Sequence, residues 1–185
     1  MMTRVMIVGG SGTGKSWLAT RLSALSGVPV YHMDQLSWMP GFIHRSTEEL
    51  DAITREIHAQ DQWIIDGGHY ETGVERASRA HLLLWVDPPT AVQVAQVAWR
   101  SLRWHGKVRL GMGQGCAETF GRRTLEAMTY AISSRQFHRD RATEIVENAN
   151  ANLKVTRIRS GREARAFLQH CIPVHTGAGF RIHQS

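Results

Sequence analysis

The residues with the clearest chemical meaning in this chain are residues 9–16, which read Gly-Gly-Ser-Gly-Thr-Gly-Lys-Ser. They match the pattern G-x-x-x-x-G-K-S, a loop whose backbone N–H groups surround phosphates where a strand meets a helix. In such a loop Lys15 reaches the β- and γ-phosphates, and the hydroxyl of Ser16 binds Mg²⁺. The sequence therefore predicts binding of ATP or GTP together with Mg²⁺. The residues expected to hold the nucleotide are Gly9, Gly10, Ser11, Gly12, Thr13, Gly14, Lys15, Ser16 and Trp17.

Two aspartates follow apolar residues where strands are expected to end. Asp34 comes after residues 28–33, and Asp66 comes after Trp63-Ile64-Ile65. A carboxylate at the carboxyl end of a parallel strand can face a ligand or bind a metal ion. We expect Asp66 to bind Mg²⁺ and Gly67 to let the substrate approach closely. Asp34 either binds the metal ion, holds a substrate hydroxyl or acts as a base. The alternative for each aspartate is that it only caps a turn.

Basic side chains gather in one part of the chain. Residues 100–141 contain nine basic and three acidic side chains, so they account for the whole net charge of +6. Arginine dominates this set, and its planar group makes paired bonds to phosphate. Three interpretations are open: a clamp around polyphosphates, a patch for nucleic acid, or a solvated basic face. We favour the clamp, with Arg100, Arg103, Arg109 and Arg139 closing over the phosphates, and regard nucleic acid as the less favoured partner.

Residues 103–120 join two expected helices and are rich in glycine and arginine; we name them the lid segment. Glycine gives mobility and arginine supplies charge, as a lid that closes over phosphates requires. Closure would exclude water, which would otherwise accept the phosphoryl group. We expect the arginines to have no nearby acidic partners, so residues 103–115 should be mobile without ligand and ordered with both substrates bound. An ordinary flexible loop is the alternative.

The elements that must position these residues alternate between strand and helix. Because alternating apolar strands and helices indicate a parallel sheet covered on both faces, the sequence predicts an α/β fold with its ligand at the carboxyl ends of the strands. The expected strands are residues 3–8, 28–32, 63–65, 80–86 and 153–158. The expected helices are residues 15–26, 46–57, 90–104, 120–148 and 162–171.

Length and composition predict one domain over residues 1–185, with a tail from residue 172 that shows no clear pattern. Two cysteines in no metal-like spacing, and no recognisable signal peptide, favour a cytoplasmic protein. No apolar run approaches the ~20 residues of a membrane span, so no membrane association is expected. Trp38, in an aromatic loop after the second strand, either contacts the substrate or packs loosely on the core.

Four segments together resemble a known family. These are residues 9–16, 29–34, 63–67 and 115–120, and the similarity runs from about residue 3 to residue 168. The chain is similar to the adenylate-kinase-related P-loop proteins, and within them to the DNA topology modulation proteins. A weaker similarity to shikimate and gluconate kinases rests on Asp34.

The resemblance implies a P-loop NTPase fold of the nucleoside-monophosphate-kinase type, with a five-stranded parallel sheet flanked by helices and a lid. Asp66-Gly67 corresponds to the strand end of adenylate kinases, but Gly68-His69-Tyr70 replaces the Phe-Pro-Arg that follows there. The arginine that would hold the acceptor phosphate is therefore displaced, and Arg76 and Arg79 are the candidates to replace it, with Arg76 expected to bind the substrate.

Together these observations predict an ATP-dependent kinase that transfers the γ-phosphoryl group of Mg·ATP to a nucleotide, a nucleoside or another small acceptor. Such chemistry needs positioning and charge more than covalent help. The expected catalytic residues are Lys15, Asp66, Arg100, Arg103 and Arg139. The alternatives are a kinase of the shikimate or gluconate type and an NTPase associated with nucleic acid.

Overall fold

The computed structural model describes residues 1–174 and 177–183 of the chain. Its core is a five-stranded parallel sheet in the order β2-β5-β1-β6-β7. The sheet strands are β1 (Arg4–Val8), β2 (Val30–His32), β5 (Trp63–Asp66), β6 (Leu82–Val86) and β7 (Lys154–Ile158). All five were predicted, within two residues at each end, because their apolar side chains form nearly continuous runs. The α/β fold and the parallel sheet are confirmed.

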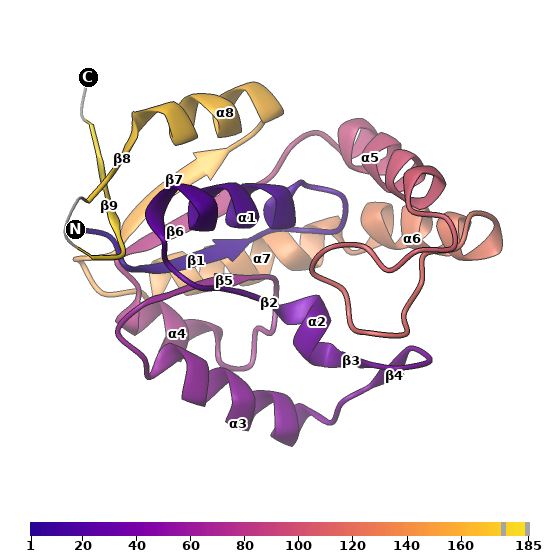
Figure 1. Cartoon of the computed structure of the whole chain (residues 1–185), viewed down its shortest axis with the longest axis horizontal. Coiled ribbons are helices and arrows are strands. Elements are labelled where there is room, and N and C mark those ends of the chain that lie inside the picture. The colour runs from indigo at the N-terminus through magenta and orange to yellow at the C-terminus, as the bar shows by residue number, and fades with distance from the viewer. Residues whose placement is uncertain (175–176, 184–185) are drawn as a thin grey trace.

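Helices cover both faces of the sheet (Figure 1). One face packs against α1 (Lys15–Ser26) and α8 (Gly161–His170), and the other against α3 (Thr47–His58), α4 (Gly73–Arg79) and α7 (Arg135–Glu147). The strands contribute fully buried side chains to both layers. Burying apolar surface on both faces is what holds such a sheet together. Helix α4 was not predicted, because its sequence Gly-Val-Glu-Arg-Ala-Ser-Arg shows no apolar stripe.

The expected helix over residues 120–148 is two helices. Helix α6 (Arg122–Ser133) ends at Ser134, whose backbone N–H and side chain both bond the carbonyl of Tyr130, and α7 follows at once. The chain must turn there because α6 packs against α5 (Thr90–Arg103), whereas α7 packs against α4 and the sheet. No glycine or proline marks the turn in the sequence, so the break could not be seen there.

The segments beyond the carboxyl ends of the strands form the surroundings of the site. They are α2 (Met33–Ser37), the small hairpin of β3 (Trp38–Met39) and β4 (Ile43–His44), helices α5 and α6, and the lid segment between them (Figure 1). After Arg103 the lid segment contains no helix or strand.

The tail is not loose where the structure describes it. Strands β8 (Cys171–Pro173) and β9 (Phe180–Ile182) form an antiparallel hairpin, and Phe180 is fully buried in the core. Met2 exchanges backbone hydrogen bonds with Phe180, so the two ends of the chain are joined. Residues 175–176 and 184–185, which also belong to the tail from residue 172, lie outside the described residues. Within the described residues no helix is long and apolar enough to cross a membrane.

Candidate active site

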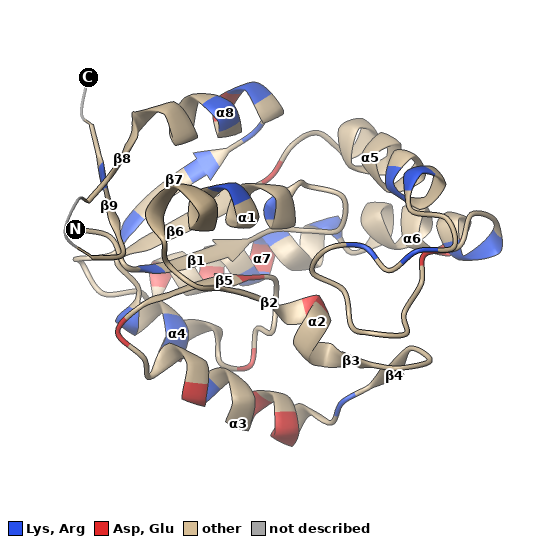
Figure 2. Ribbon diagram, in the orientation of Figure 1, with Lys and Arg blue, Asp and Glu red and all other residues tan. Residues whose placement is uncertain are grey.

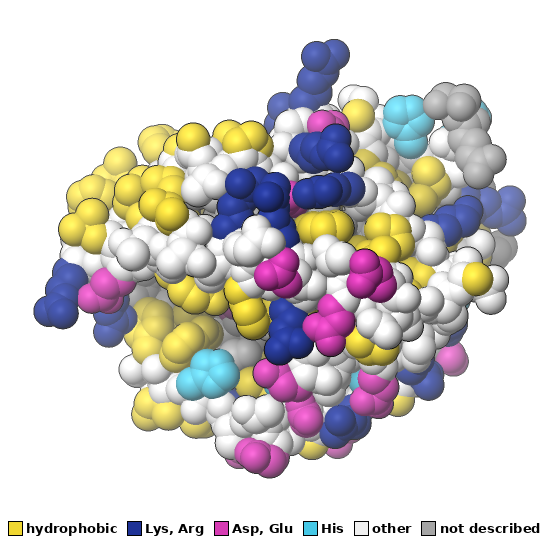
Figure 3. All heavy atoms as spheres, turned by 180° about the vertical axis from the view of Figure 1, so that it is seen from behind, with side chains coloured by type: hydrophobic (Ala, Val, Ile, Leu, Met, Phe, Trp, Pro, Cys, Tyr) yellow, Lys and Arg dark blue, Asp and Glu magenta, His cyan; other side chains and the backbone are white. Residues whose placement is uncertain are grey.

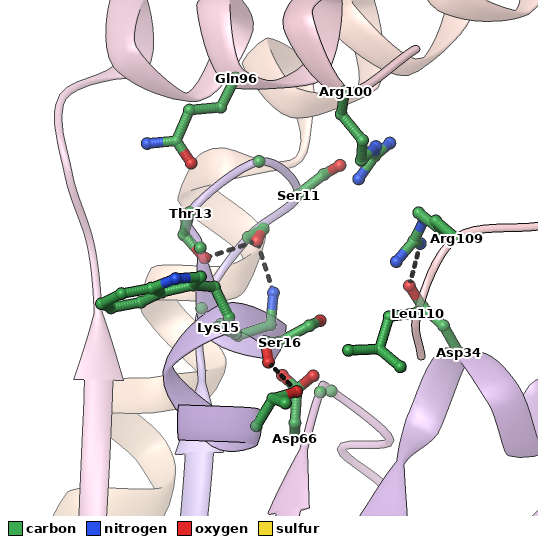
Figure 4. Close-up of a pocket in the computed structure, with 18 of the residues that line it drawn as sticks. Ser11, Thr13, Lys15, Ser16, Asp34, Asp66, Gln96, Arg100, Arg109 and Leu110 are labelled. Carbon is green, nitrogen blue, oxygen red and sulfur yellow. Dashed lines mark hydrogen bonds and ion pairs between the residues drawn. The ribbon is translucent and has the colours of Figure 1, made fainter. Parts of the chain in front are cut away.

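A cavity of about 790 Å³ opens at the carboxyl ends of β1, β2 and β5. The phosphate loop, residues 9–16, forms one wall, and α5 and the lid segment form the opposite wall (Figure 4). The structure brings most of the predicted site residues to this cavity: residues 9–17, Asp34, Asp66, Gly67, Arg100, Arg103 and Arg109.

The phosphate loop needs its glycines for space as well as for backbone freedom. Gly9 has φ of +142°, and a Cβ there would lie 2.1 Å from the carbonyl oxygen of Val86. Gly12 has φ of +71°, and its Cβ would lie 2.3 Å from the carbonyl oxygen of Gln93. A side chain at either position would therefore clash with backbone. The loop ends at the first turn of α1, where N–H groups without helical partners favour an anion.

Lys15 points into this loop. Its ammonium Nζ donates a hydrogen bond to the carbonyl of Gly10 at 2.7 Å. Burial lowers the pKa of Lys15 from its usual value, and the nearby carboxylates of Asp66 and Asp34 partly oppose that effect. A partly buried cation with only one neutral hydrogen-bond partner among the described residues would gain from an anionic ligand.

Asp66 has one carboxylate oxygen engaged and one free. Oδ2 lies 2.8 Å from Nδ1 of His32, its partner in the parallel register of β2 and β5. Oδ1 is buried and has no hydrogen-bond partner among the described residues. A buried carboxylate oxygen without a partner is costly, and such oxygens are the ligands that Mg²⁺ prefers. The donor set of Asp66 and Ser16 therefore fits Mg²⁺, with His32 fixing the orientation of the carboxylate.

The lid segment is tied to the rest of the site through Arg109. The Nη2 atom of Arg109 lies 2.7 Å from Oδ2 of Asp34, and its Nε lies 2.8 Å from Oε1 of Glu118. Arg100 of α5 reaches the same oxygen of Glu118 at 3.3 Å. The expectation that the arginines of residues 103–115 lack acidic partners is therefore wrong for Arg109. Figure 2 shows basic residues along the end of α5 and the lid segment, with acidic residues at α2 and within the lid segment.

These contacts shift the pKa values of the site. Partial burial alone would raise the pKa of Asp34, but the charge and hydrogen bond of Arg109 outweigh it and lower the pKa. Burial likewise opposes the charge of Arg109, but Asp34 and Glu118 raise its pKa. Asp34 is therefore a carboxylate and Arg109 a cation at neutral pH.

His138 of α7 also lines the cavity, beside the phosphate loop. Its ring lies 3.4 Å from where a Cβ on Gly10 would be. The hydroxyl of Tyr70 lies 2.9 Å from Nδ1, and that of Tyr130 lies 3.4 Å from Nε2. Burial and the charge of Lys15 lower the pKa of His138 to about 4, so the ring is neutral at neutral pH.

A second, smaller cavity of about 220 Å³ adjoins the phosphate loop on the side of β6 and α8. It shares Thr13, Gly14, Trp17 and Gln96 with the large cavity. Its other walls come from the segments after β6 and β7, including Pro88 and residues 160–161. The phosphate loop therefore lies between two hollows, and the two carboxylates lie only in the larger one.

Three predicted residues do not line the cavity. Trp38 stacks edge-on against Phe42 and His44 in the β3–β4 hairpin, and its carbonyl group faces Gly113 of the lid segment. Arg76 is fully buried in α4, where Nη2 donates to the carbonyl of His69, and burial lowers its pKa to about 10.

Arg139 is the third. It bonds Asp87 at 2.9 Å, and neither residue lines the cavity. In the sequence nothing separates an arginine that faces a ligand from one that meets an internal partner, because the partner lies far along the chain.

Several cavity residues were not predicted. Gln96, Trp99, Trp104, Leu110, Tyr130 and His138 line the cavity, and His32 orients Asp66 without lining it. Of these residues, only His32 could have been identified from the sequence as part of the site, because it directly precedes Met33-Asp34 at the expected end of a strand. The others lie on helices or in the lid segment, where their side chains have no distinctive spacing.

Comparison with known proteins gives matches in structure only. No family model matches the chain, and no curated protein is significantly similar in sequence. A shikimate kinase from Acinetobacter baumannii, solved in complex with shikimate, is 15% identical with a TM-score of 0.55 over 91% of this chain and 90% of its own. A shikimate kinase from Bacteroides thetaiotaomicron is 16% identical with a TM-score of 0.52 over 91% of this chain and 95% of its own. The chain shares the fold of these two kinases. The resemblance to the DNA topology modulation proteins stays a prediction.

Proposed function

We propose that this protein is an ATP-dependent kinase that phosphorylates a hydroxyl group of a small molecule. The observation that carries the proposal is a single cavity in which Lys15 and the phosphate loop face two carboxylates, Asp34 and Asp66. A phosphate-binding wall opposite carboxylates is what a phosphoryl transfer to a neutral acceptor requires. The shared fold with two shikimate kinases, one of them solved in complex with shikimate, a molecule that bears hydroxyl groups, agrees with this acceptor class.

The two carboxylates of the cavity, Asp34 and Asp66, favour a hydroxyl group over a phosphate group as the acceptor of the phosphoryl group. A nucleoside monophosphate would bring a dianion close to Asp34 and Asp66, where like charges repel. Arg76, the candidate for holding such a phosphate, is buried away from the cavity. Arg109 is already paired with two carboxylates. A nucleoside remains a suitable acceptor, because it offers a hydroxyl group.

Each residue would have a distinct part in the transfer. Bound Mg²⁺ would neutralise charge on the β- and γ-phosphates. Asp34 would accept the hydrogen bond of the acceptor hydroxyl and take its proton as that oxygen bonds to the γ-phosphorus and the bond to ADP breaks. Lys15 and the loop N–H groups would stabilise the charge that develops on the phosphoryl oxygens. Ser16 and Asp66 would hold the metal ion.

The nucleoside part of ATP would lie in the smaller cavity. The phosphate loop separates the two cavities, so a nucleotide whose γ-phosphate faces Asp34 must extend its base the other way, toward β6 and α8. Trp17 and Pro88 give that cavity apolar walls suited to a planar base. Arg100 and Arg103 would then close over the phosphates from the opposite wall, whereas Arg109 stays paired with Asp34 and Glu118.

The test is transfer of labelled γ-phosphate from ATP, with Mg²⁺ present, to a panel of acceptors. The panel holds polyhydroxy acids, sugars, polyols, nucleosides and nucleoside monophosphates, with Lys15→Ala as the inactive control. We expect labelled product from a hydroxyl acceptor at a rate well above hydrolysis. Transfer only to the phosphate of nucleoside monophosphates would contradict the acceptor class, and hydrolysis alone across the whole panel would contradict the kinase.

A further inference from the structure

A second charged cluster lies outside both cavities, around Asp87. This residue directly follows β6, and its carboxylate is only 5% exposed. Arg135 and Arg139 reach it from α7 at 3.3 and 2.9 Å, and Arg157 reaches it from β7 at 2.5 Å. We name these four residues the Asp87 cluster. None of the four lines either cavity.

The Asp87 cluster carries an unbalanced charge. Burial alone would raise the pKa of Asp87, but hydrogen bonds from Arg139 and Arg157 lower it below its usual value, so the carboxylate is ionised at neutral pH. Three guanidinium groups against one carboxylate leave two positive charges. Among the described residues no other carboxylate pairs with these arginines. Like charges held this close repel one another unless an anion joins them.

Most of the hydrogen-bond donors of the cluster are unused. Within residues 1–174 and 177–183, only four of the nine guanidinium nitrogens donate a hydrogen bond: Nη2 of Arg135, Nε and Nη2 of Arg139, and Nη2 of Arg157. The Nε of Arg135 is buried and has no partner among the described residues. A buried donor without an acceptor costs free energy, so the cluster would gain from a further acceptor.

The three arginines can be reached from solvent, and one of them stacks on an aromatic ring. Arg157 lies over the ring of Trp85 at 4.3 Å, which fixes the plane of its guanidinium group. The side chains of Arg135, Arg139 and Arg157 are 24, 35 and 35% exposed. On the face opposite that of Figure 1, Figure 3 shows Lys and Arg side chains gathered together. The donors are therefore oriented before any ligand arrives, which lowers the entropic cost of binding.

We propose that the Asp87 cluster is a binding site for a phosphate group, either inorganic phosphate or the phosphate of a small monoester. Such a dianion neutralises the two excess charges, and guanidinium groups pair with two phosphate oxygens at a time. A nucleic-acid strand fits less well, because each of its phosphates carries one charge and its binding needs basic residues in a row rather than in one compact group. The site is separate from the proposed kinase cavity and does not depend on its function.

Solution NMR of the full chain can test this site directly. The ¹⁵N-labelled protein is titrated with inorganic phosphate at constant ionic strength, and the Nε–Hε signals of Arg135, Arg139 and Arg157 are followed. We expect saturable shifts in all three. They should persist in Lys15→Ala, which weakens phosphate binding at the phosphate loop. Arg157→Gln should weaken the binding by at least about tenfold, whereas Arg181→Gln, at an exposed position on β9, should leave it unchanged.

Two further titrations identify the source of the phosphate. Glycerol 3-phosphate that binds more tightly than inorganic phosphate assigns the site to an organic monoester, and equal affinities assign it to the phosphate group alone. Absence of saturable shifts in the wild-type protein overturns the proposal, whether or not Arg157→Gln folds. Shifts that disappear in Lys15→Ala would mean that phosphate binds only at the phosphate loop. Shifts with an oligonucleotide alone would replace the proposal with a nucleic-acid surface.

Discussion

Arg109 and Asp34 lie 75 residues apart in the chain, yet the guanidinium Nη2 of one is 2.7 Å from the carboxylate of the other. The pair joins the lid segment to α2 across the mouth of the cavity. Two further contacts support this docking: the Sγ of Cys116 donates to the carbonyl of Met39, and Gly111 lies so close to the ring of His32 that a Cβ would be 2.8 Å from it. The lid segment therefore has specific partners before any ligand is bound.

The first prediction follows from this pair. Asp34→Asn removes the charge that holds Arg109, which costs about 1 kcal/mol for a partly exposed pair. Amide hydrogen exchange over residues 103–120 should become about fivefold faster in the ligand-free protein. Kinase turnover should also fall by at least about tenfold, because the acceptor hydroxyl loses its base. Glu56→Gln, at an exposed position on α3, is the matched control. Unchanged exchange would mean that the pair does not restrain the lid segment.

The second prediction concerns nucleotide binding. Lys15→Ala removes a charge directed at the phosphates and should weaken Mg·ATP binding by at least about tenfold, since bonds to charged groups contribute about 1.5–3 kcal/mol. The fold should persist, because a partly buried ammonium that donates one hydrogen bond contributes little to packing. Calorimetry on the folded variant measures the change, with Lys154→Ala, exposed on β7, as control. Wild-type affinity in Lys15→Ala would contradict the assignment of the loop.

The third prediction separates metal binding from nucleotide binding. Asp66→Asn keeps an oxygen that can accept a bond from His32 but removes the negative charge beside Ser16. Nucleotide binding without metal should be retained, whereas Mg²⁺-dependent turnover should fall by at least about tenfold, or about 1.4 kcal/mol in the barrier. Titration of Mg²⁺ in the activity assay measures the effect. Turnover at the wild-type level would mean that Asp66 has only a structural part, through its bond to His32.

The sheet and the phosphate loop could be predicted from sequence because their determinants are local. Strands such as Val5–Val8 and Ile64–Ile65 are continuous apolar runs, and the loop has a fixed spacing of glycines before Lys15. The carboxyl end of a parallel strand is also a position that sequence can identify, and Asp34 and Asp66, which were expected near such ends, both line the cavity.

The arginines could not be assigned in the same way. Arg109 meets Asp34, Arg139 meets Asp87 and Arg76 is buried in α4, and each outcome depends on which elements pack together. Counting charges over residues 100–141 finds the excess but not all its partners, because Asp34 and Asp87, which lie outside this window, supply some of them. The turn at Ser134 was hidden for a similar reason, since tertiary packing and not a helix-breaking residue determines it.

The last prediction uses the neutral ring of His138. Burial and Lys15 lower its pKa to about 4, whereas the unfolded chain titrates near the ordinary value of 6.5. Between these values the unfolded state binds more protons than the folded state, so the contribution of His138 to stability is complete above pH 6.5 and is lost as the pH falls toward 4.

His138→Gln removes the group that takes up a proton between pH 6.5 and pH 4. The glutamine side chain can still form a hydrogen bond with Tyr70 or Tyr130. The free energy of unfolding should therefore decrease less between pH 7 and pH 5 in the variant than in the wild-type protein, by on the order of 1 kcal/mol for a half-buried group. Urea unfolding at the two pH values measures the difference, and His183→Gln, at an exposed position, should behave as the wild-type protein does. Equal pH dependence in His138→Gln and the wild type would mean that the ring takes up its proton in the folded state as readily as in the unfolded chain. In that case a charged His138 would stand beside the phosphate loop at mildly acidic pH, and ATP affinity should rise there instead of staying constant.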